Sequence, residues 1–206
     1  MSNTTHIKIL FLDIGGVMLN NGWDRNARKK AVAIFKLDET EVDERHHLTF
    51  DTYEEGKITL DEYLDRVIFY TKRSFTKKKF KEFMFQQSAP IPEMITLMKN
   101  VKKKNGIRIA VVNNEGRELN EYRINTFGLN TFVDFFISSS FVHIRKPDAD
   151  IFKLALDIAL VKPEEVFYVD DRGMFVQIAQ SIGIKGVIHK DIEATKKAMK
   201  EAGLKV

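Results

Sequence analysis

The sequence contains no cysteine, only four prolines and a single tryptophan among its 206 residues. The absence of cysteine excludes disulfide bonds, thiolate nucleophiles and cysteine-bound metal ions. No stretch reaches the ~18 uncharged apolar residues that a membrane-spanning helix needs, and the N-terminal MSNTTHIK lacks the basic-then-apolar layout of a signal peptide. We therefore expect a soluble, cytoplasmic protein that does not act at a membrane.

Charged residues make up 30% of the chain, and the formal net charge is +4. The lysines gather in short runs at residues 77–81 and 102–104. We interpret these runs as solvated helix faces and give less weight to a nucleic-acid surface. The nearby Phe75, Phe80 and Phe83 recur at helical spacing, which is typical of a core rather than of base stacking. A mildly positive field favours small anionic ligands, and no nucleic-acid partner is expected.

Short apolar runs alternate with helical patterns in the second half of the chain. This alternation predicts βαβ units and a doubly wound parallel sheet that is buried on both faces. The predicted strands are residues 7–12, 107–112, 133–137, 166–169 and, more weakly, 186–188; the predicted helices are residues 117–127, 148–159 and 175–182.

Residues between about 22 and 90 show helical periodicity without a convincing strand. Within them Thr59 precedes Glu62 with the spacing of a capping box, and Gly56 marks a turn with a positive φ. We expect an α/β core of residues 1–20 and 91–206, with residues 21–90, the helical block, inserted after the first strand. The predicted helices of this block are residues 27–35, 42–50, 60–69 and 77–86.

Polar side chains follow four of the predicted strands. In an open parallel sheet the ligand crevice lies beyond the carboxyl ends of the strands, so these side chains are expected at one edge. They are Asp13, the pair Asn113 and Asn114, Lys146, and the pair Asp170 and Asp171. Taken singly, Asp13 could be a turn or helix-capping residue, Asp170 and Asp171 could cap the helix at 175–182, and Lys146 could be a loop lysine. Their coincidence at one edge favours a site.

The chemistry of these groups fits phosphoryl transfer. A carboxylate such as Asp13 attacks phosphorus to form an acyl phosphate that water hydrolyses. Mg²⁺ prefers oxygen ligands, and Asp13, Asp171, Asp170 and the Gly15 carbonyl are the expected metal ligands.

The phosphoryl group itself needs a separate set of contacts. Lys146 would offset its charge, and the Asn113 and Asn114 side chains would lie at the phosphate. Gly15 and Gly16 would let backbone N–H groups approach it.

These four loops resemble those of the haloacid dehalogenase (HAD) superfamily of phosphohydrolases. The matching segments are DIGGV at 13–17, VVNN at 111–114, RKPD at 145–148 and VDDR at 169–172, in the family's order. The resemblance implies a Rossmann-like core, and it identifies the helical block as a C1 cap. The closest subgroup is the sugar-phosphate phosphatases of the glucose-1-phosphate type, which share a glycine at position 15. The resemblance implies a Mg²⁺-dependent phosphatase of a small phosphorylated metabolite, for which a sugar phosphate is one candidate. The reaction would pass through an aspartyl phosphate, with Asp13 and Lys146 as catalytic residues.

One departure from the family pattern concerns the general acid. Most family phosphatases carry an aspartate two residues after the nucleophile, where this chain has Gly15. General acid–base help contributes typically ~10²–10⁴-fold, so its loss would slow hydrolysis unless the leaving group needs little protonation or another group replaces it. Glu115, Arg117 and His143 are candidates by position, and for each of them a solvated loop position is the alternative.

Further departures are Asn113, where the family has Ser or Thr, and Phe175, where many members have a polar residue that supports the metal. Trp23 could line the pocket mouth or be buried at the junction of core and cap. A non-catalytic protein that keeps the fold and binds a ligand or partner is therefore the competing hypothesis. The sequence carries no signal for the oligomeric state.

Overall fold

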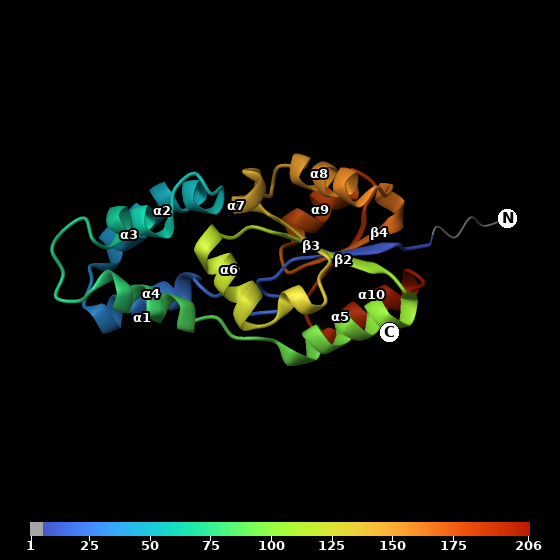
Figure 1. Ribbon diagram of the computed structural model, residues 1–206, viewed down its shortest axis with the longest axis horizontal. Helices are drawn as coiled ribbons and strands as arrows, with labels where there is room; N and C mark the ends of the chain where they lie inside the picture. Colours follow the sequence, from blue (N-terminus) through green and yellow to red (C-terminus); the bar gives the residue numbers. More distant parts are fainter. Residues whose placement is uncertain (1–5) are drawn as a thin grey trace.

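The computed structural model describes residues 6–206, so residues 1–5 of the N-terminal stretch considered above lie outside the described residues. Residues 6–206 form a five-stranded sheet in the order β3-β2-β1-β4-β5, with every neighbouring pair parallel (Figure 1). The strands are β1 Ile9–Leu12, β2 Arg108–Asn113, β3 Phe135–Ser138, β4 Val166–Asp170 and β5 Lys185–Ile188. All five predicted strands are present, and the α/β doubly wound fold is confirmed.

Helices cover both faces of the sheet and form a separate layer at one end of the molecule (Figure 1). In that end layer lie α1 Arg25–Phe35, α2 Glu39–Glu54, α3 Leu60–Val67 and α4 Lys77–Gln86. The helices around the sheet are α5 Pro92–Asn105, α6 Arg117–Thr126, α7 Ser139–Val142, α8 Asp150–Ala159, α9 Gly173–Ser181 and α10 Ile192–Glu201. Short 3₁₀ turns lie at η1 Leu129–Thr131 and η2 Pro163–Glu165.

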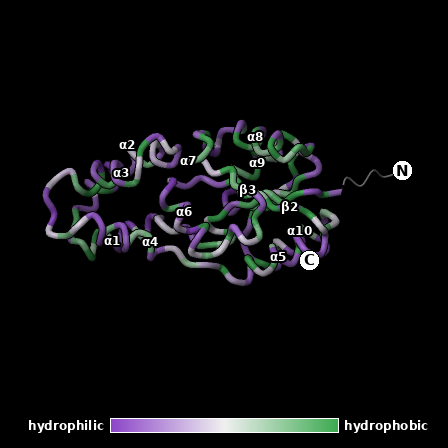
Figure 2. Tube along the Cα trace, viewed as in Figure 1, coloured by the Kyte–Doolittle hydropathy of each residue, from purple (hydrophilic) through white to green (hydrophobic). Residues whose placement is uncertain are grey.

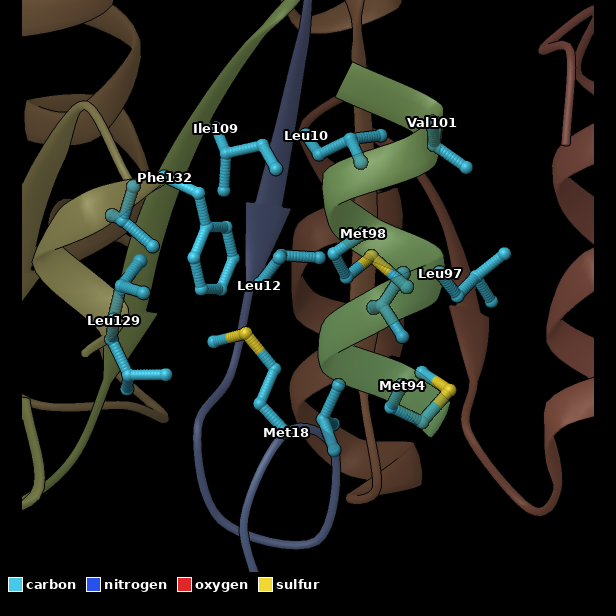
Figure 3. Close-up of a cluster of buried hydrophobic side chains, with 14 of the residues drawn as sticks. Leu10, Leu12, Met18, Met94, Leu97, Met98, Val101, Ile109, Leu129 and Phe132 are labelled. Carbon is cyan, nitrogen blue, oxygen red and sulfur yellow. The ribbon is translucent and has the colours of Figure 1, made fainter. Parts of the chain in front are cut away.

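The central strands β1, β2 and β4 are mostly apolar because each buries side chains on both faces of the sheet. Successive residues point to opposite faces, so in β1 Leu10 and Leu12 join one cluster while Ile9 and Phe11 join the other. The first cluster lies under α5 and α10, and Figure 3 shows Leu10 and Leu12 beside Met98 of α5. Figure 2 shows hydrophobic stretches in the strands and mixed hydropathy along the helices. The sheet is therefore a rigid platform with its strand ends directed at the helical block.

The helical block has a hydrophobic cluster of its own, built largely from aromatic rings. Phe80 is fully buried in it, and Leu119 of α6 joins it, while Ile124 of the same helix joins the cluster on the sheet. α6 thus connects the two, and Figure 1 shows it between them. The burial of Phe80 supports its interpretation as core. The division into a core and an inserted domain remains a prediction, since packing alone does not fix its boundaries.

Local predictions in the helical block are met in detail. Thr59 and Glu62 form the capping box: the Glu62 N–H donates to Thr59 Oγ1 (3.2 Å) and the Thr59 N–H donates to Glu62 Oε2 (2.8 Å). Gly56 has a φ of 68°. α4 begins and ends at the predicted residues, whereas α2 extends beyond both predicted ends.

Helices α5, α7 and α10 were not predicted. α5 nevertheless has Pro92 at its start and Gly106 in the left-handed conformation at its end, which are ordinary helix boundary signals. Asp191 caps α10 by accepting a hydrogen bond from the Ala194 N–H (2.7 Å). Among residues 6–206, no helix is both long enough and apolar enough to cross a membrane.

Candidate active site

Lys146 lies at the centre of the site. Its side chain is 1% exposed, and Nζ donates to Asp13 Oδ1 (2.9 Å), Asp170 Oδ2 (2.7 Å) and the Tyr168 hydroxyl (3.1 Å). Asp13 follows β1 and Asp170 ends β4, while Lys146 reaches them from the loop before α8. The alternative of a solvated loop lysine is therefore wrong, because this ammonium is buried between two carboxylates.

Three carboxylates converge beside this lysine. Oxygen atoms of Asp13, Asp170 and Asp171 lie within 4.8 Å of one another. Asp170 is the most engaged of the three: Oδ2 accepts from Lys146 and from the Tyr168 hydroxyl, and Oδ1 accepts from the Arg172 N–H (2.7 Å), which leaves one acceptor site on Oδ1. Asp13 and Asp171 keep oxygen capacity for a cation. Neither Asp170 nor Asp171 caps α9, which has no side-chain cap, so that alternative is wrong.

The electrostatics of the cluster call for an additional positive charge. Burial raises the pKa of Asp13 from 3.8 to about 7; Lys146 opposes this rise, and Asp170 and Asp171 add to it. Burial tends to lower the pKa of Lys146, but Asp13 and Asp170 outweigh it and raise that pKa. Three carboxylates against one ammonium leave a net negative charge. A divalent cation with oxygen preference fits this donor set, and Mg²⁺ is consistent with it.

The turn after β1 is built around glycine. Gly16 has a φ of 67°, and a Cβ there would collide with the Asp171 carboxylate, so glycine is required for the two loops to approach. At Gly15 a Cβ would lie 2.7 Å from Asn21 Oδ1. The Asn21 amide in turn donates to Asp171 Oδ2 (3.3 Å). Asn21 thus occupies the space that a side chain at position 15 would need.

The two asparagines after β2 lie in different surroundings. Asn113 is buried in a side-chain network: Ser138 Oγ donates to its Oδ1 (2.7 Å), and its amide donates to Asn120 Oδ1 (3.1 Å). Asn114 holds the Lys146 backbone by accepting from its N–H (2.8 Å) and donating to its carbonyl (2.7 Å). A phosphate-binding role for either remains a prediction, and Asn114 is the one that lines the cavity.

A cavity of about 420 Å³ opens over the cluster, between the sheet edge and the helical block. This volume lies within the ~300–1,000 Å³ of small-molecule sites. Among the predicted site residues it is lined by Asp13, Gly15, Asn114, Lys146 and Asp171, whereas Gly16, Asn113 and Asp170 lie behind that lining.

Of the three residues considered above as substitutes for the missing general acid, only Glu115 lines the cavity. Arg123 Nη1 lies 2.5 Å from Glu115 Oε2. Burial raises the pKa of Glu115, although Arg123 opposes this. Arg117 instead donates to the Ser140 carbonyl (2.9 Å), and His143 Nδ1 lies 2.8 Å from the Glu55 carbonyl oxygen.

Two aromatic residues discussed above also reach the cavity. Trp23 is buried in the helical block and lines the cavity as well, so both interpretations of it hold. Its indole N–H donates to the Tyr63 hydroxyl (3.0 Å). The ring of Phe175 lies over Lys146 Nζ, 4.8 Å from the ring centroid, and this contact adds a cation–π attraction.

Several site residues were not recognised from the sequence. Tyr168 could have been, because it precedes Asp170 by two residues on a strand and therefore shares its face. Glu54 from the helical block and Arg145 line the cavity as an ion pair with Nη2–Oε2 at 2.6 Å. Glu54 and Arg145 are 91 positions apart in the sequence, whereas Arg123 on α6 pairs with Glu115 in the loop before that helix, eight positions earlier. No local pattern reports either pairing.

The sequence as a whole matches a known family. The model of the haloacid dehalogenase-like hydrolases matches residues 28–188. The chain therefore belongs to the haloacid dehalogenase-like hydrolase family. The match begins after the loop that carries Asp13, so the assignment rests on the helical block and three later strands together with β5, and it confirms the HAD resemblance.

Individual relatives support the same family. A phosphorylated carbohydrates phosphatase from Thermotoga maritima is 27% identical over 152 residues, which are 72% of this chain and 65% of that protein. The haloacid dehalogenase-like hydrolase domain-containing protein 3 of Mus musculus is 31% identical over 101 residues, 48% of this chain and 40% of that protein. The matched part spans less than two thirds of the length of these curated relatives.

Solved structures share the fold. A HAD family enzyme from Bacteroides thetaiotaomicron, crystallised with magnesium and inorganic phosphate, superposes with a TM-score of 0.74 at 23% identity over 89% of this chain and 94% of that one. An L-2-haloacid dehalogenase from Xanthobacter autotrophicus superposes with a TM-score of 0.63 at 16% identity over 96% and 88% of the two chains. At these identities the likeness concerns the fold alone.

Proposed function

We propose that this HAD-like hydrolase is a Mg²⁺-dependent phosphatase of a small phosphorylated metabolite, acting through an aspartyl phosphate on Asp13. The observation that carries the proposal is the buried cluster in which Lys146 Nζ lies between Asp13 and Asp170 while Asp171 stands beside them at the cavity. The relative described as a phosphorylated carbohydrates phosphatase supports sugar phosphates as the substrate class.

The residues divide the work by their contacts. Asp13 supplies the attacking carboxylate oxygen, and Lys146 neutralises charge between that oxygen and the phosphoryl group. Asp13, Asp171, Asp170 and the Gly15 carbonyl are the proposed Mg²⁺ ligands, and Asp170 also orients Lys146 through the hydrogen bond to Nζ. When bound, Mg²⁺ would neutralise the carboxylates and the phosphate oxygens.

The cavity lining favours an anionic ligand. Its six basic residues outnumber its five acidic ones, which favours an anion over a cation as the organic ligand. The basic residues are Arg25, Arg28, Arg123, Arg145, Lys146 and Arg172, and the acidic ones are Asp13, Asp24, Glu54, Glu115 and Asp171. Halide displacement, the other reaction of this superfamily, needs no metal site, so the cluster of three carboxylates favours phosphate.

The test is phosphate release from a panel of sugar 1-phosphates, sugar 6-phosphates and acyl phosphates, with Mg²⁺ and with a chelator. Asp13→Asn protein, checked for folding by circular dichroism, is the control. Release that requires Mg²⁺ and disappears in Asp13→Asn is the expected result. If the folded wild type releases no more phosphate than the variant from every compound, the phosphatase proposal falls and a ligand-binding protein takes its place.

A further inference from the structure

The missing acid at position 15 leaves the proposed reaction without a proton for the leaving group. The Asn21 side chain occupies the space beside Gly15, with its Oδ1 2.7 Å from the place of a Cβ. An amide donates hydrogen bonds but does not release a proton at neutral pH. For a leaving group that needs protonation, such as a sugar hydroxyl, the proton has to come from a group other than residue 15.

Most cavity-lining acids already have another task. Asp13 and Asp171 are the proposed nucleophile and metal ligand. Asp24 caps α1, since its Oδ1 accepts from the Ala27 N–H (2.8 Å). Glu115 is locked to Arg123, whose side chain is 2% exposed and whose other amino group donates to the Asn20 carbonyl. Within residues 6–206, neither histidine nor tyrosine lines the cavity.

Glu54 is the remaining carboxyl group. It too pairs with an arginine, but the Arg145 side chain is 24% exposed, whereas Arg123 is buried with Glu115. We infer that Glu54, at the C-terminal end of α2, donates the proton to the leaving-group oxygen in place of an aspartate at position 15. The inference rests on the proposed phosphatase function. It assigns the proton donor to the helical block, so the reaction needs that block closed over the strand ends.

The end of α2 is held firmly enough for this role. Ser139 Oγ donates to the Glu54 carbonyl (2.6 Å), and the Tyr53 ring packs so closely on Gly116 that a Cβ there would collide with it. Arg145 donates two hydrogen bonds to the carboxylate itself, from Nη2 (2.6 Å) and Nε (3.1 Å) to Glu54 Oε2. The second oxygen, Oε1, carries no such contact to Arg145. A proton donor held on a rigid element keeps its geometry through the reaction.

The surroundings of Glu54 also suit proton transfer near neutral pH. Burial raises its pKa to about 7; Arg145 opposes this rise, while Glu115 from the loop after β2 and Asp51 from α2 itself add to it. A carboxyl group in this range holds a proton in part of the molecules and releases it readily.

The atoms balance in two steps. A carboxylate oxygen of Asp13 bonds to phosphorus, the bond from phosphorus to the leaving oxygen breaks, and Glu54 gives its proton to that oxygen, releasing an alcohol. Water then attacks phosphorus, the bond to Asp13 breaks, and one proton of that water returns to Glu54, releasing inorganic phosphate.

The test compares a poor with a good leaving group in Glu54→Gln protein. With enzyme in excess, the first-turnover release of alcohol from a sugar phosphate and of nitrophenolate from p-nitrophenyl phosphate is measured. We expect the first rate to fall ~10²–10⁴-fold and the second to change less than about tenfold, because nitrophenolate leaves without protonation. Asp51→Asn is the matched control, since Asp51 also pairs with Arg145 (2.8 Å) but is exposed; it should change the ratio of the two rates far less than Glu54→Gln does, because Asp51 is only the smallest of the contributions to the pKa of Glu54.

A second readout needs no variant. In the wild type, the ratio of sugar-phosphate to p-nitrophenyl-phosphate rates should fall as the pH rises above about 7, because Glu54 loses its proton. An equal loss on both substrates in Glu54→Gln, or a ratio that does not change with pH, would mean that Glu54 only anchors Arg145, and it would overturn the inference while leaving the phosphatase intact. Absence of Mg²⁺-dependent release on either substrate in the wild type would instead overturn the proposed function.

Discussion

Replacing Asp13 with asparagine should stabilise the metal-free protein at about pH 8. The folded protein holds the pKa of Asp13 near 7, whereas the ordinary value is 3.8. Between these values the folded state binds more protons than the unfolded state, so stability falls as the pH rises through this window. Above about pH 7 the ionised Asp13 carboxylate destabilises the folded state by its full amount, and asparagine, which carries no charge, removes that destabilisation.

The magnitude follows from the pKa difference. About three pKa units at ~1.4 kcal/mol each give an upper bound of about 4 kcal/mol. The substitution also weakens the hydrogen bond from Lys146 and removes one of its two counter-charges. We therefore expect a net gain of about 1–3 kcal/mol, which for a chain of this size raises the melting temperature by roughly 2–10 °C.

The assay is thermal and urea unfolding of both proteins at about pH 8, first with a chelator and then with Mg²⁺. With Mg²⁺ the difference in stability between the two proteins should become smaller or change sign. A ligand that binds only the folded state stabilises the wild type more, because the wild type keeps the complete site. Asp61→Asn is the control: a hydrogen bond from Lys81 lowers the pKa of this exposed carboxyl group, so its loss should not stabilise. An Asp13→Asn protein that is less stable than the wild type in chelator would refute the electrostatic reasoning.

Other predictions concern the helical block and the glycine turn. Burial lowers the pKa of His46 from 6.5 to about 3, so the free energy of unfolding should fall by about 2–3 kcal/mol as the pH drops from 7 to about 4.5. In urea unfolding at a series of pH values, His46→Gln should show a weaker dependence of this free energy on pH. The same dependence in the variant and the wild type would contradict the prediction. Gly16→Ala should weaken Mg²⁺ binding, measured by calorimetry, because the new Cβ collides with Asp171. Gly106→Ala is the control: Gly106 has a similar φ of 64° but open space around it, so this variant should share only the ~1–2 kcal/mol of backbone strain. Equal Mg²⁺ affinity in the two variants would argue against the clash. Thr59→Ala should cost about 1 kcal/mol in urea unfolding by removing the cap of α3, and a loss below the error of the method would show that the cap is dispensable.

The predictability of the fold follows from its architecture. A buried parallel strand is apolar along nearly its whole length, so runs such as 107–112, which Arg108 alone interrupts, stand out without reference to the rest of the chain. Helices α5 and α10 were not predicted, although α10 has the same length as α4, α6 and α8, which were. Their boundary signals, Pro92 with Gly106 and Asp191, are nevertheless present in the sequence.

The candidate site divides in the same way. Asp13, Lys146, Asp170 and Asp171 were found because parallel strands deliver their carboxyl ends to one edge, which makes position along the chain informative about position in space. The side chain of Asn113 is engaged with Ser138 and does not line the cavity, so its contact with the phosphate stays a prediction from the sequence.

By itself the sequence determined the parallel sheet, the helical block after β1 and the carboxylates at the strand ends, because each depends on local periodicity or on the order of loops. The tertiary structure decided which charges meet: Glu54 with Arg145 across the junction of block and sheet, Arg123 with Glu115, and Asn21 beside Gly15. These contacts join segments that no periodicity relates, and their energies depend on burial, which exists only once the chain has packed.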